Sequence, residues 1–169
     1  MPSKRDVDVG EARIEFLLEG TGDAVVLIPG GGLDASYFAD LGQRIAHAGF
    51  CAIAVNPRGT GSSAGRLAGL TLHTLAADVA AVIDALGSGP VHLLGHGFSN
   101  RVARCLAADR PDLVRSVILF AGVGLIVPEP EIVRALQAWS VRTRPRPTVS
   151  RRPNNSSPIR QRHKRSFVK

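Results

Sequence analysis

The residues whose types and spacing could support chemistry lie in three glycine-containing loops, and each loop directly follows a short apolar run. The loops are Pro29–Gly32, Asn56–Gly61 and Gly95–Ser99. Glycines allow a backbone N–H to approach a developing negative charge closely, so the first loop has the composition of an oxyanion-binding turn. The third loop adds an imidazole, His96, and a hydroxyl, Ser99, which are a candidate base and a candidate nucleophile.

The apolar runs and stripes that flank these loops predict the elements that position them. Short apolar runs predict strands, and apolar residues at helical spacing predict helices. Their alternation predicts right-handed crossovers and an α/β fold, in which a mostly parallel sheet is flanked by helices. Ligand sites in such sheets form at the carboxyl ends of the strands, where all three loops lie. We expect strands over 12–18, 24–28, 51–55, 91–94 and 116–120, helices over 37–48, 75–86 and 99–109, and a fourth helix that opens at Pro130 and includes Ile132, Val133, Leu136 and Trp139.

The order and spacing of the three loops around these strands resemble the α/β-hydrolase fold family, over roughly Ala12–Trp139. The resemblance implies that the chain holds the N-terminal part of this fold, truncated before its later strands. It implies a hydrolase of the carboxylic-ester class, acting on esters or lactones with no cofactor and no bound metal. It also implies that Gly31 is an oxyanion donor, with Gly32 as the neighbouring candidate, although the family usually has His where Pro29 stands. A tight turn that leaves a strand would need the same glycines.

The second loop resembles the family's Asp-x-Arg-Gly-x-Gly-x-Ser loop, with Asn56 in place of the aspartate. We interpret this loop as scaffolding rather than as a source of catalytic groups. Arg58 is expected to anchor backbone carbonyls instead of contacting a substrate.

The third loop resembles the family's nucleophile elbow, Gly-x-Ser-x-Gly, in which the nucleophile sits in a strained turn between a strand and a helix. Here Gly95 matches the first glycine, Gly97 stands at the nucleophile position and Ser99 stands at the second glycine. The residue after the nucleophile position, Phe98, would supply a further oxyanion N–H. Glycine has no nucleophilic group, so an acyl-enzyme route through position 97 is excluded.

The remaining candidate side chains do not replace the nucleophile. Ser99 is a weak candidate, because in the first turn of a helix its hydroxyl is expected to cap a backbone N–H. His96 stands where the family often has a His without a catalytic role. His47, His73 and His92 show no partner pattern, and each is interpreted as a satisfied surface or core histidine.

A working triad also needs an acid and a histidine after the nucleophile. Asp109 and Asp112 fall at a helix end and in the turn after it, where aspartate is common, and His163 lies among arginines and lysines. We therefore expect that the acid and the histidine are missing from this chain and that it is catalytically incomplete.

The sequence is also compatible with two other functions. One is that of a non-catalytic relative that binds a small acyl or ester ligand. The other rests on residues 140–169, which hold eight arginines, two lysines and no acidic residue, whereas residues 1–139 hold 11 basic and 14 acidic groups. Such a segment could bind nucleic acid or an anionic membrane without sequence specificity. We favour an incidental peptide, since the abrupt change near Ser140 is what an out-of-frame translation would produce.

The predicted organisation is a partial hydrolase-like domain over 1–139 and a basic, Arg/Pro/Ser-rich disordered segment over 140–169.

No signal peptide or membrane-spanning run is predicted, which favours the cytoplasm. Cys51 and Cys105 are interpreted as buried free thiols. A sheet that stops at 116–120 would expose an unpaired edge, so we expect self-association through that edge. The substrate cannot be read from these loops.

Overall fold

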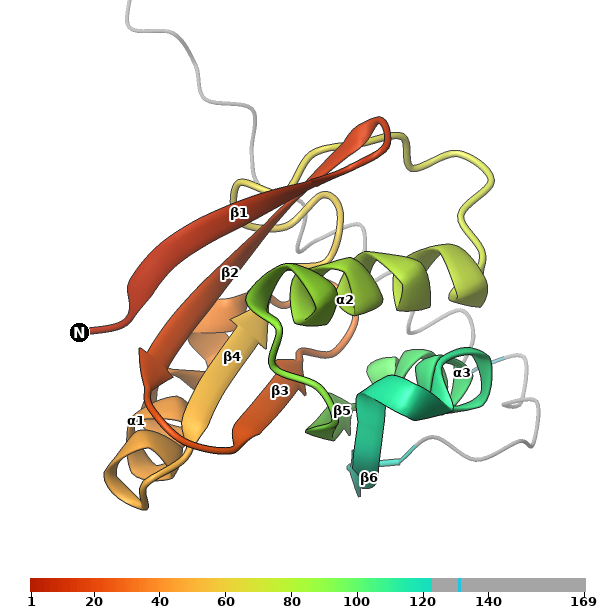
Figure 1. The fold of residues 1–169 in the computed structure, drawn as a ribbon. Helices are drawn as coiled ribbons and strands as arrows, with labels where there is room; N and C mark the ends of the chain where they lie inside the picture. Colours follow the sequence, from red (N-terminus) through yellow and green to blue (C-terminus); the bar gives the residue numbers. More distant parts are fainter. Residues whose placement is uncertain (123–130, 132–169) are drawn as a thin grey trace, which may run out of the picture.

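The structure is a computed structural model, and it describes residues 1–122 and residue 131. Within these residues, six strands form one mixed sheet. The strand order is β1-β2-β4-β3-β5-β6 (Figure 1). β4, β3, β5 and β6 pair in parallel, while β1 and β2 run antiparallel to their neighbours. The predicted mostly parallel α/β sheet is therefore confirmed. The strands are β1 (Ser3–Val9), β2 (Ala12–Gly20), β3 (Ala24–Ile28), β4 (Cys51–Val55), β5 (Val91–His96) and β6 (Val114–Phe120).

Three α-helices connect the parallel strands, because parallel neighbours need a crossover over one face of the sheet. The helices are α1 (Ala39–His47), α2 (Leu72–Leu86) and α3 (Ser99–Asp109), with short 3-10 turns at Ala35–Phe38 and Pro111–Leu113. α1 covers one face, and α2 and α3 lie together on the other (Figure 1). None of the described helices combines the length and the apolar character that crossing a membrane requires.

The apolar residues of β3 alternate between two cores, one on each face of the sheet. Val25 and Leu27 pack on the side of α1, whereas Val26 and Ile28 pack on the side of α2 and α3. Successive side chains of a strand point to opposite faces, so a strand that is apolar throughout is stable only when both faces are covered. This burial fixes β3 at the centre of the sheet and holds the carboxyl end of β3, and the glycine loop after it, between β4 and β5.

The structure differs from the sequence-based expectation mainly near the N-terminus. Ser3–Val9 form β1, which pairs with β2 at the edge of the sheet. This strand is charged and mostly exposed, so no apolar period marks it in the sequence. The expected helix over 37–48 is a 3-10 turn followed by α1, and β6 begins at Val114 instead of Ser116. The helix expected at Pro130 and the disordered segment expected over 140–169 lie outside the described residues.

The outer edge of β6 pairs with no other strand of the described residues. Ile118, Leu119 and Phe120 keep between 45% and 51% of their surface exposed. Self-association through this edge stays a prediction.

A buried polar network fixes the loop after β4 against β2. Glu15 is only 5% exposed, and its carboxylate binds Lys4 Nζ at 2.6 Å, Asn56 Nδ2 at 2.5 Å and the Ser62 amide at 3.0 Å. The Oδ1 atom of Asn56 accepts a hydrogen bond from the Ala35 amide at 2.6 Å, so the same side chain also reaches the segment before α1. Burial alone would raise the pKa of Glu15, but the hydrogen bonds from Lys4, Ser62 and Asn56 lower it to about 2.

The low pKa of Glu15 predicts a loss of stability in acid. The pKa of glutamate in an unfolded chain is about 4.3, so the stabilisation by Glu15 is complete above that pH and is lost as the pH falls toward about 2. Between pH 6 and pH 3 the free energy of unfolding should fall by about 2 kcal/mol through this group. Urea unfolding of the wild type and of Glu15→Gln at both pH values measures it. A stability difference between the two proteins that is the same at pH 6 and pH 3 would contradict the assignment.

Candidate active site at the end of the central strands

The turn between β5 and α3 is built around two glycines. Gly97 lies at its tip with φ +54°, a left-handed conformation that side chains rarely adopt, and its N–H donates to the Phe120 carbonyl at 3.0 Å. A Cβ atom added at Gly97 would meet none of the described residues within 4 Å, its chain neighbours aside. A Cβ atom at Gly95, in contrast, would lie 2.5 Å from the Ser99 carbonyl oxygen. The first turn of α3 therefore packs directly on β5, while position 97 is not crowded by any part of the chain that the structure describes.

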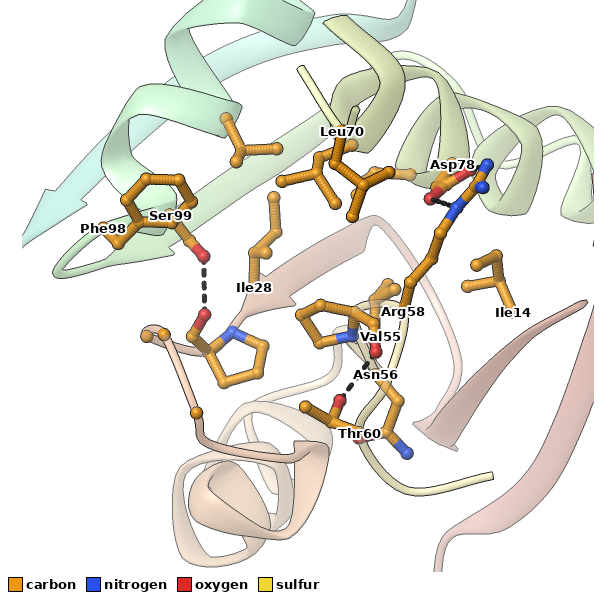
Figure 2. Close-up of a pocket in the computed structure, with 18 residues that line it drawn as sticks. Ile14, Ile28, Val55, Asn56, Arg58, Thr60, Leu70, Asp78, Phe98 and Ser99 are labelled. Atoms are coloured by element: carbon orange, nitrogen blue, oxygen red, sulfur yellow. Dashed lines mark hydrogen bonds and ion pairs between the residues drawn. The ribbon is translucent and has the colours of Figure 1, made fainter. Parts of the chain in front are cut away.

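Ser99 links this turn to the glycine loop after β3. Its Oγ donates to the Pro29 carbonyl at 2.6 Å (Figure 2), and the residue is 3% exposed. The expectation that Ser99 caps a backbone N–H of the helix is wrong, because Phe98 is the N-cap residue and no side-chain cap is formed. The hydroxyl proton is used within the fold, so Ser99 serves as a tether between the two loops.

The glycine loop and the turn between β5 and α3 lie close to each other. A Cβ atom at Gly31 would lie 3.9 Å from the Cβ of Phe98, and Gly32 turns the chain with φ +79°. The amides of Gly31, Gly32 and Phe98 donate to no other residue of the described part of the chain. Free N–H groups from these two loops are what an oxyanion hole requires. Their role as oxyanion donors stays a prediction.

His96 packs as an aromatic ring beside the same loops. It stacks on Tyr37 with ring centroids 4.9 Å apart and an interplanar angle of 11°, and it also contacts the rings of Phe38 and Phe120. A Cβ atom at Gly30 would lie 3.0 Å from its Nδ1, which is buried and has no hydrogen-bond partner among the described residues. In the described part of the chain His96 thus packs against aromatic rings, and its Nδ1 makes no hydrogen bond to a nucleophilic side chain.

A cavity of about 190 Å³ opens between the turn, the glycine loop and the loop after β4. Figure 2 shows Phe98, Ser99 and Ile28 on one side and Asn56, Arg58 and Thr60 on another. Its walls are mostly apolar, and backbone from both glycine-rich loops contributes to them. The lining residues are Ile14, Ile28, Pro29, Gly30, Gly31, Gly32, Val55, Asn56, Pro57, Arg58, Thr60, Leu70, Leu75, Asp78, Val79, Phe98, Ser99 and Val102.

Arg58 is neutralised within this cavity wall. Its Nε binds Asp78 Oδ2 at 2.6 Å and its Nη2 binds Oδ1 at 2.8 Å, and both side chains are buried, with 7% and 4% exposed. The hydrogen bond and charge of Asp78 raise the pKa of Arg58 further above its ordinary value. The prediction that Arg58 anchors backbone carbonyls is wrong, because its described hydrogen bonds are to the carboxylate of Asp78 on α2. An aspartate within the apolar stripe of that helix was the signal for such a partner.

Two of the other histidines have partners that the sequence did not indicate. His73 Nδ1 lies 2.6 Å from Asp109 Oδ2 and 3.3 Å from Cys105 Sγ, and His92 Nδ1 lies 2.8 Å from Ser116 Oγ. Both cysteines are free but only partly buried, which corrects the expectation of buried thiols. Asp112 pairs with Arg110 at 2.8 Å. None of these groups lines the cavity beside Gly97.

Comparisons with known proteins agree with this geometry. Residues 23–161 match the family model described as alpha/beta hydrolase fold. The 2-(acetamidomethylene)succinate hydrolase of Mesorhizobium japonicum is 33% identical over 134 residues, which are 79% of this chain and 47% of that protein. The 2-hydroxy-6-oxononadienedioate/2-hydroxy-6-oxononatrienedioate hydrolase of Burkholderia vietnamiensis is 33% identical over 141 residues, which are 78% of this chain and 49% of that protein.

A solved structure agrees as well. The crystal structure of E-2-(acetamidomethylene)succinate hydrolase matches with a TM-score of 0.76 and 31% identity, over 84% of this chain and 52% of that chain. The chain thus spans about half the length of these relatives.

The two glycines of the turn should respond very differently to alanine. Gly95→Ala places a Cβ against the Ser99 carbonyl, so we expect a loss of about 3 kcal/mol in the free energy of unfolding. In Gly97→Ala the added Cβ contacts none of the residues that the structure describes and is strained by the positive φ, so the loss should be about 1 kcal/mol. Urea unfolding of the two variants makes the comparison. Equal losses would show that α3 does not pack on β5 as described.

Proposed function

The chain belongs to the α/β-hydrolase fold family, and on that premise we propose that it is an ester- or lactone-hydrolase-like protein that binds a small acyl or ester ligand without forming a covalent intermediate at its elbow. The observation that carries the proposal is Gly97. It occupies the tip of the turn between β5 and α3, at positive φ and with no described residue within 4 Å of an added Cβ, where the family presents a nucleophile.

Covalent acyl transfer needs an atom at this position that can attack. The attacking group forms a bond to the carbonyl carbon and the alcohol of the ester leaves, and glycine supplies no such group. Ser99 does not replace it, because its hydroxyl is buried and donates to the Pro29 carbonyl. These two facts support a site that binds a carbonyl group and does not attack it.

We also propose that the acid and the histidine base of a catalytic triad are missing. Among the described residues that follow the turn, Asp109 and Asp112 are engaged with His73 and Arg110, at a distance from the cavity. His163 lies outside the described residues. We infer that restoring a hydroxyl at position 97 does not by itself restore catalysis, because none of the described residues is positioned to remove its proton.

The cavity favours an uncharged ligand. Its walls are mostly apolar, and Arg58, the one cationic residue among the described residues that line it, is already paired with Asp78. The two hydrolases compared above are named for substrates with carboxylate groups, which a free cation would bind. In this chain Asp78 already compensates the charge of Arg58, so a ligand carboxylate would meet no net positive charge in the described wall. We therefore infer a neutral acyl or ester ligand whose carbonyl oxygen faces Gly31 and Phe98.

Turnover of p-nitrophenyl acetate tests the catalytic half of the proposal. We expect neither the wild type nor Gly97→Ser to hydrolyse the ester faster than Gly31→Pro, which lacks the N–H of the glycine loop. The additional side chain in Gly97→Ser has room in the structure, so the variant should fold. Circular dichroism of each protein checks this. Hydrolysis by the wild type or by Gly97→Ser at ten times the rate of Gly31→Pro would overturn the proposal.

Ligand-detected NMR tests the binding half. Phenyl acetate should show saturation transfer from the wild type, and succinate should show none at the same concentration. Leu70→Trp fills the cavity from its loop without altering the turn, so it should abolish the phenyl acetate signal. A signal that survives in Leu70→Trp would place the ligand elsewhere.

A further inference from the structure

Three side chains with different donor atoms converge on the outer side of α2 and α3. His73 lies in the first turn of α2, while Cys105 and Asp109 lie one turn apart on α3. His73 Nδ1, Cys105 Sγ and an Asp109 carboxylate oxygen all lie within 4.8 Å of one another. None of the three residues lines the cavity beside Gly97, so this cluster is separate from the site described above.

We propose that His73, Cys105 and Asp109 form a binding site for a divalent transition-metal ion, with zinc as the ion that their donor atoms fit best. An imidazole nitrogen, a thiolate sulfur and a carboxylate oxygen are the three ligand types that proteins offer to zinc, and the thiolate disfavours magnesium and calcium. The proposal is independent of the proposed function, because it concerns other residues on another part of the surface.

The spacing of the donor atoms supports a tetrahedral site. Zinc bonds of about 2.0–2.1 Å to nitrogen and oxygen and about 2.3 Å to sulfur place tetrahedral ligands roughly 3.3–3.6 Å apart. In the structure, Cys105 Sγ lies 3.3 Å from His73 Nδ1 and 3.4 Å from Asp109 Oδ2. His73 Nδ1 and Asp109 Oδ2 are hydrogen-bonded at 2.6 Å, so they need to separate by about 0.7 Å to admit the ion. Both side chains are partly or largely exposed, which gives them room to move.

The backbone already holds two of the ligands. Residues four apart on a helix share one face, which brings Cys105 and Asp109 together without any contact from the rest of the fold. The Thr71 side chain caps α2 by accepting from the Thr74 amide at 3.1 Å, and this fixes the turn that carries His73. The metal would therefore connect the start of α2 with the end of α3.

Access from solvent leaves room for a fourth ligand. The His73 side chain is 73% exposed and that of Asp109 is 37% exposed. A groove of about 260 Å³ between the two helices begins at these residues and is lined largely by alanines of α2. A water molecule or a small anion could complete the coordination from this side, as in zinc sites with an open position.

A cysteine–histidine–aspartate relay is the alternative use of these residues, and the geometry opposes it. In a relay the two ring nitrogens contact different partners, the nucleophile on one side and the acid on the other. Here the same atom, His73 Nδ1, contacts both Cys105 and Asp109. Burial and the neighbouring carboxylate also raise the pKa of the Cys105 thiol, which disfavours a nucleophilic thiolate in the absence of a cation. Binding of a metal would replace the thiol proton and release it to solvent.

Titration of the tag-free, reduced full chain with Co²⁺ tests the proposal, because cobalt reports on zinc-type sites by its colour. We expect one equivalent of Co²⁺ to give a thiolate-to-cobalt charge-transfer band and visible bands of tetrahedral intensity, and Zn²⁺ to displace both. Cys105→Ser should abolish the charge-transfer band. His73→Gln, an exposed position where the fold should tolerate the change, should weaken binding by more than 100-fold, since loss of a group that only orients a ligand typically costs 10–100-fold.

Cys51→Ser is the matched control, because Cys51 is the other free thiol of the chain and lies away from the cluster on β4. It should leave the cobalt spectrum and the affinity unchanged. A thermal melt adds a second readout, in which Zn²⁺ raises the Tm of the wild type and of Cys51→Ser but not that of His73→Gln. The proposal is overturned if no thiolate band forms at one equivalent, or if the band survives in Cys105→Ser.

Discussion

The close packing of the first turn of α3 on β5 is the constraint on which the rest of the site depends. It is possible because Gly95 has no Cβ, and any side chain there would strike the Ser99 carbonyl. Once α3 is held this close, Ser99 reaches the Pro29 carbonyl and the Cβ of Phe98 lies near Gly31. This approach of helix to strand therefore brings together the two glycine-containing loops that line one side of the cavity.

None of these contacts uses a side chain at position 97. The tip of the turn is held by its own N–H to Phe120 and by Asn100, whose Nδ2 donates to the carbonyls of Gly97 and Phe120 at 2.8 and 3.1 Å. Glycine also adopts the left-handed conformation of the tip more readily than serine does. The backbone of the turn is therefore held by contacts that do not depend on the side chain at position 97. Arg58 likewise has a structural role, because its guanidinium pairs with Asp78 and holds the cavity wall in place.

The sequence predicted those features that depend on local patterns. The apolar runs identified five of the six described strands, and the clustered glycines identified the loops at the carboxyl ends of β3, β4 and β5. The sequence did not predict β1, because this exposed edge strand buries few side chains and so lacks the alternation of apolar residues that marks a strand. Contacts between distant residues were also missed, such as Arg58 with Asp78 and His73 with Cys105, because they exist only after the helices pack. The partner of Ser99 could not be predicted either, since a backbone carbonyl has no signal in the sequence.

The most direct test of the central claim is peptide mapping by mass spectrometry after the wild-type protein has been incubated with excess p-nitrophenyl acetate. Because the turn has no attacking group at position 97, the peptide that contains residues 95–100 should keep its unmodified mass. Exposed lysines should be acetylated slowly. Stoichiometric acetylation of Ser99 would contradict the claim, because it would mean that the hydroxyl leaves the Pro29 carbonyl and attacks the ester.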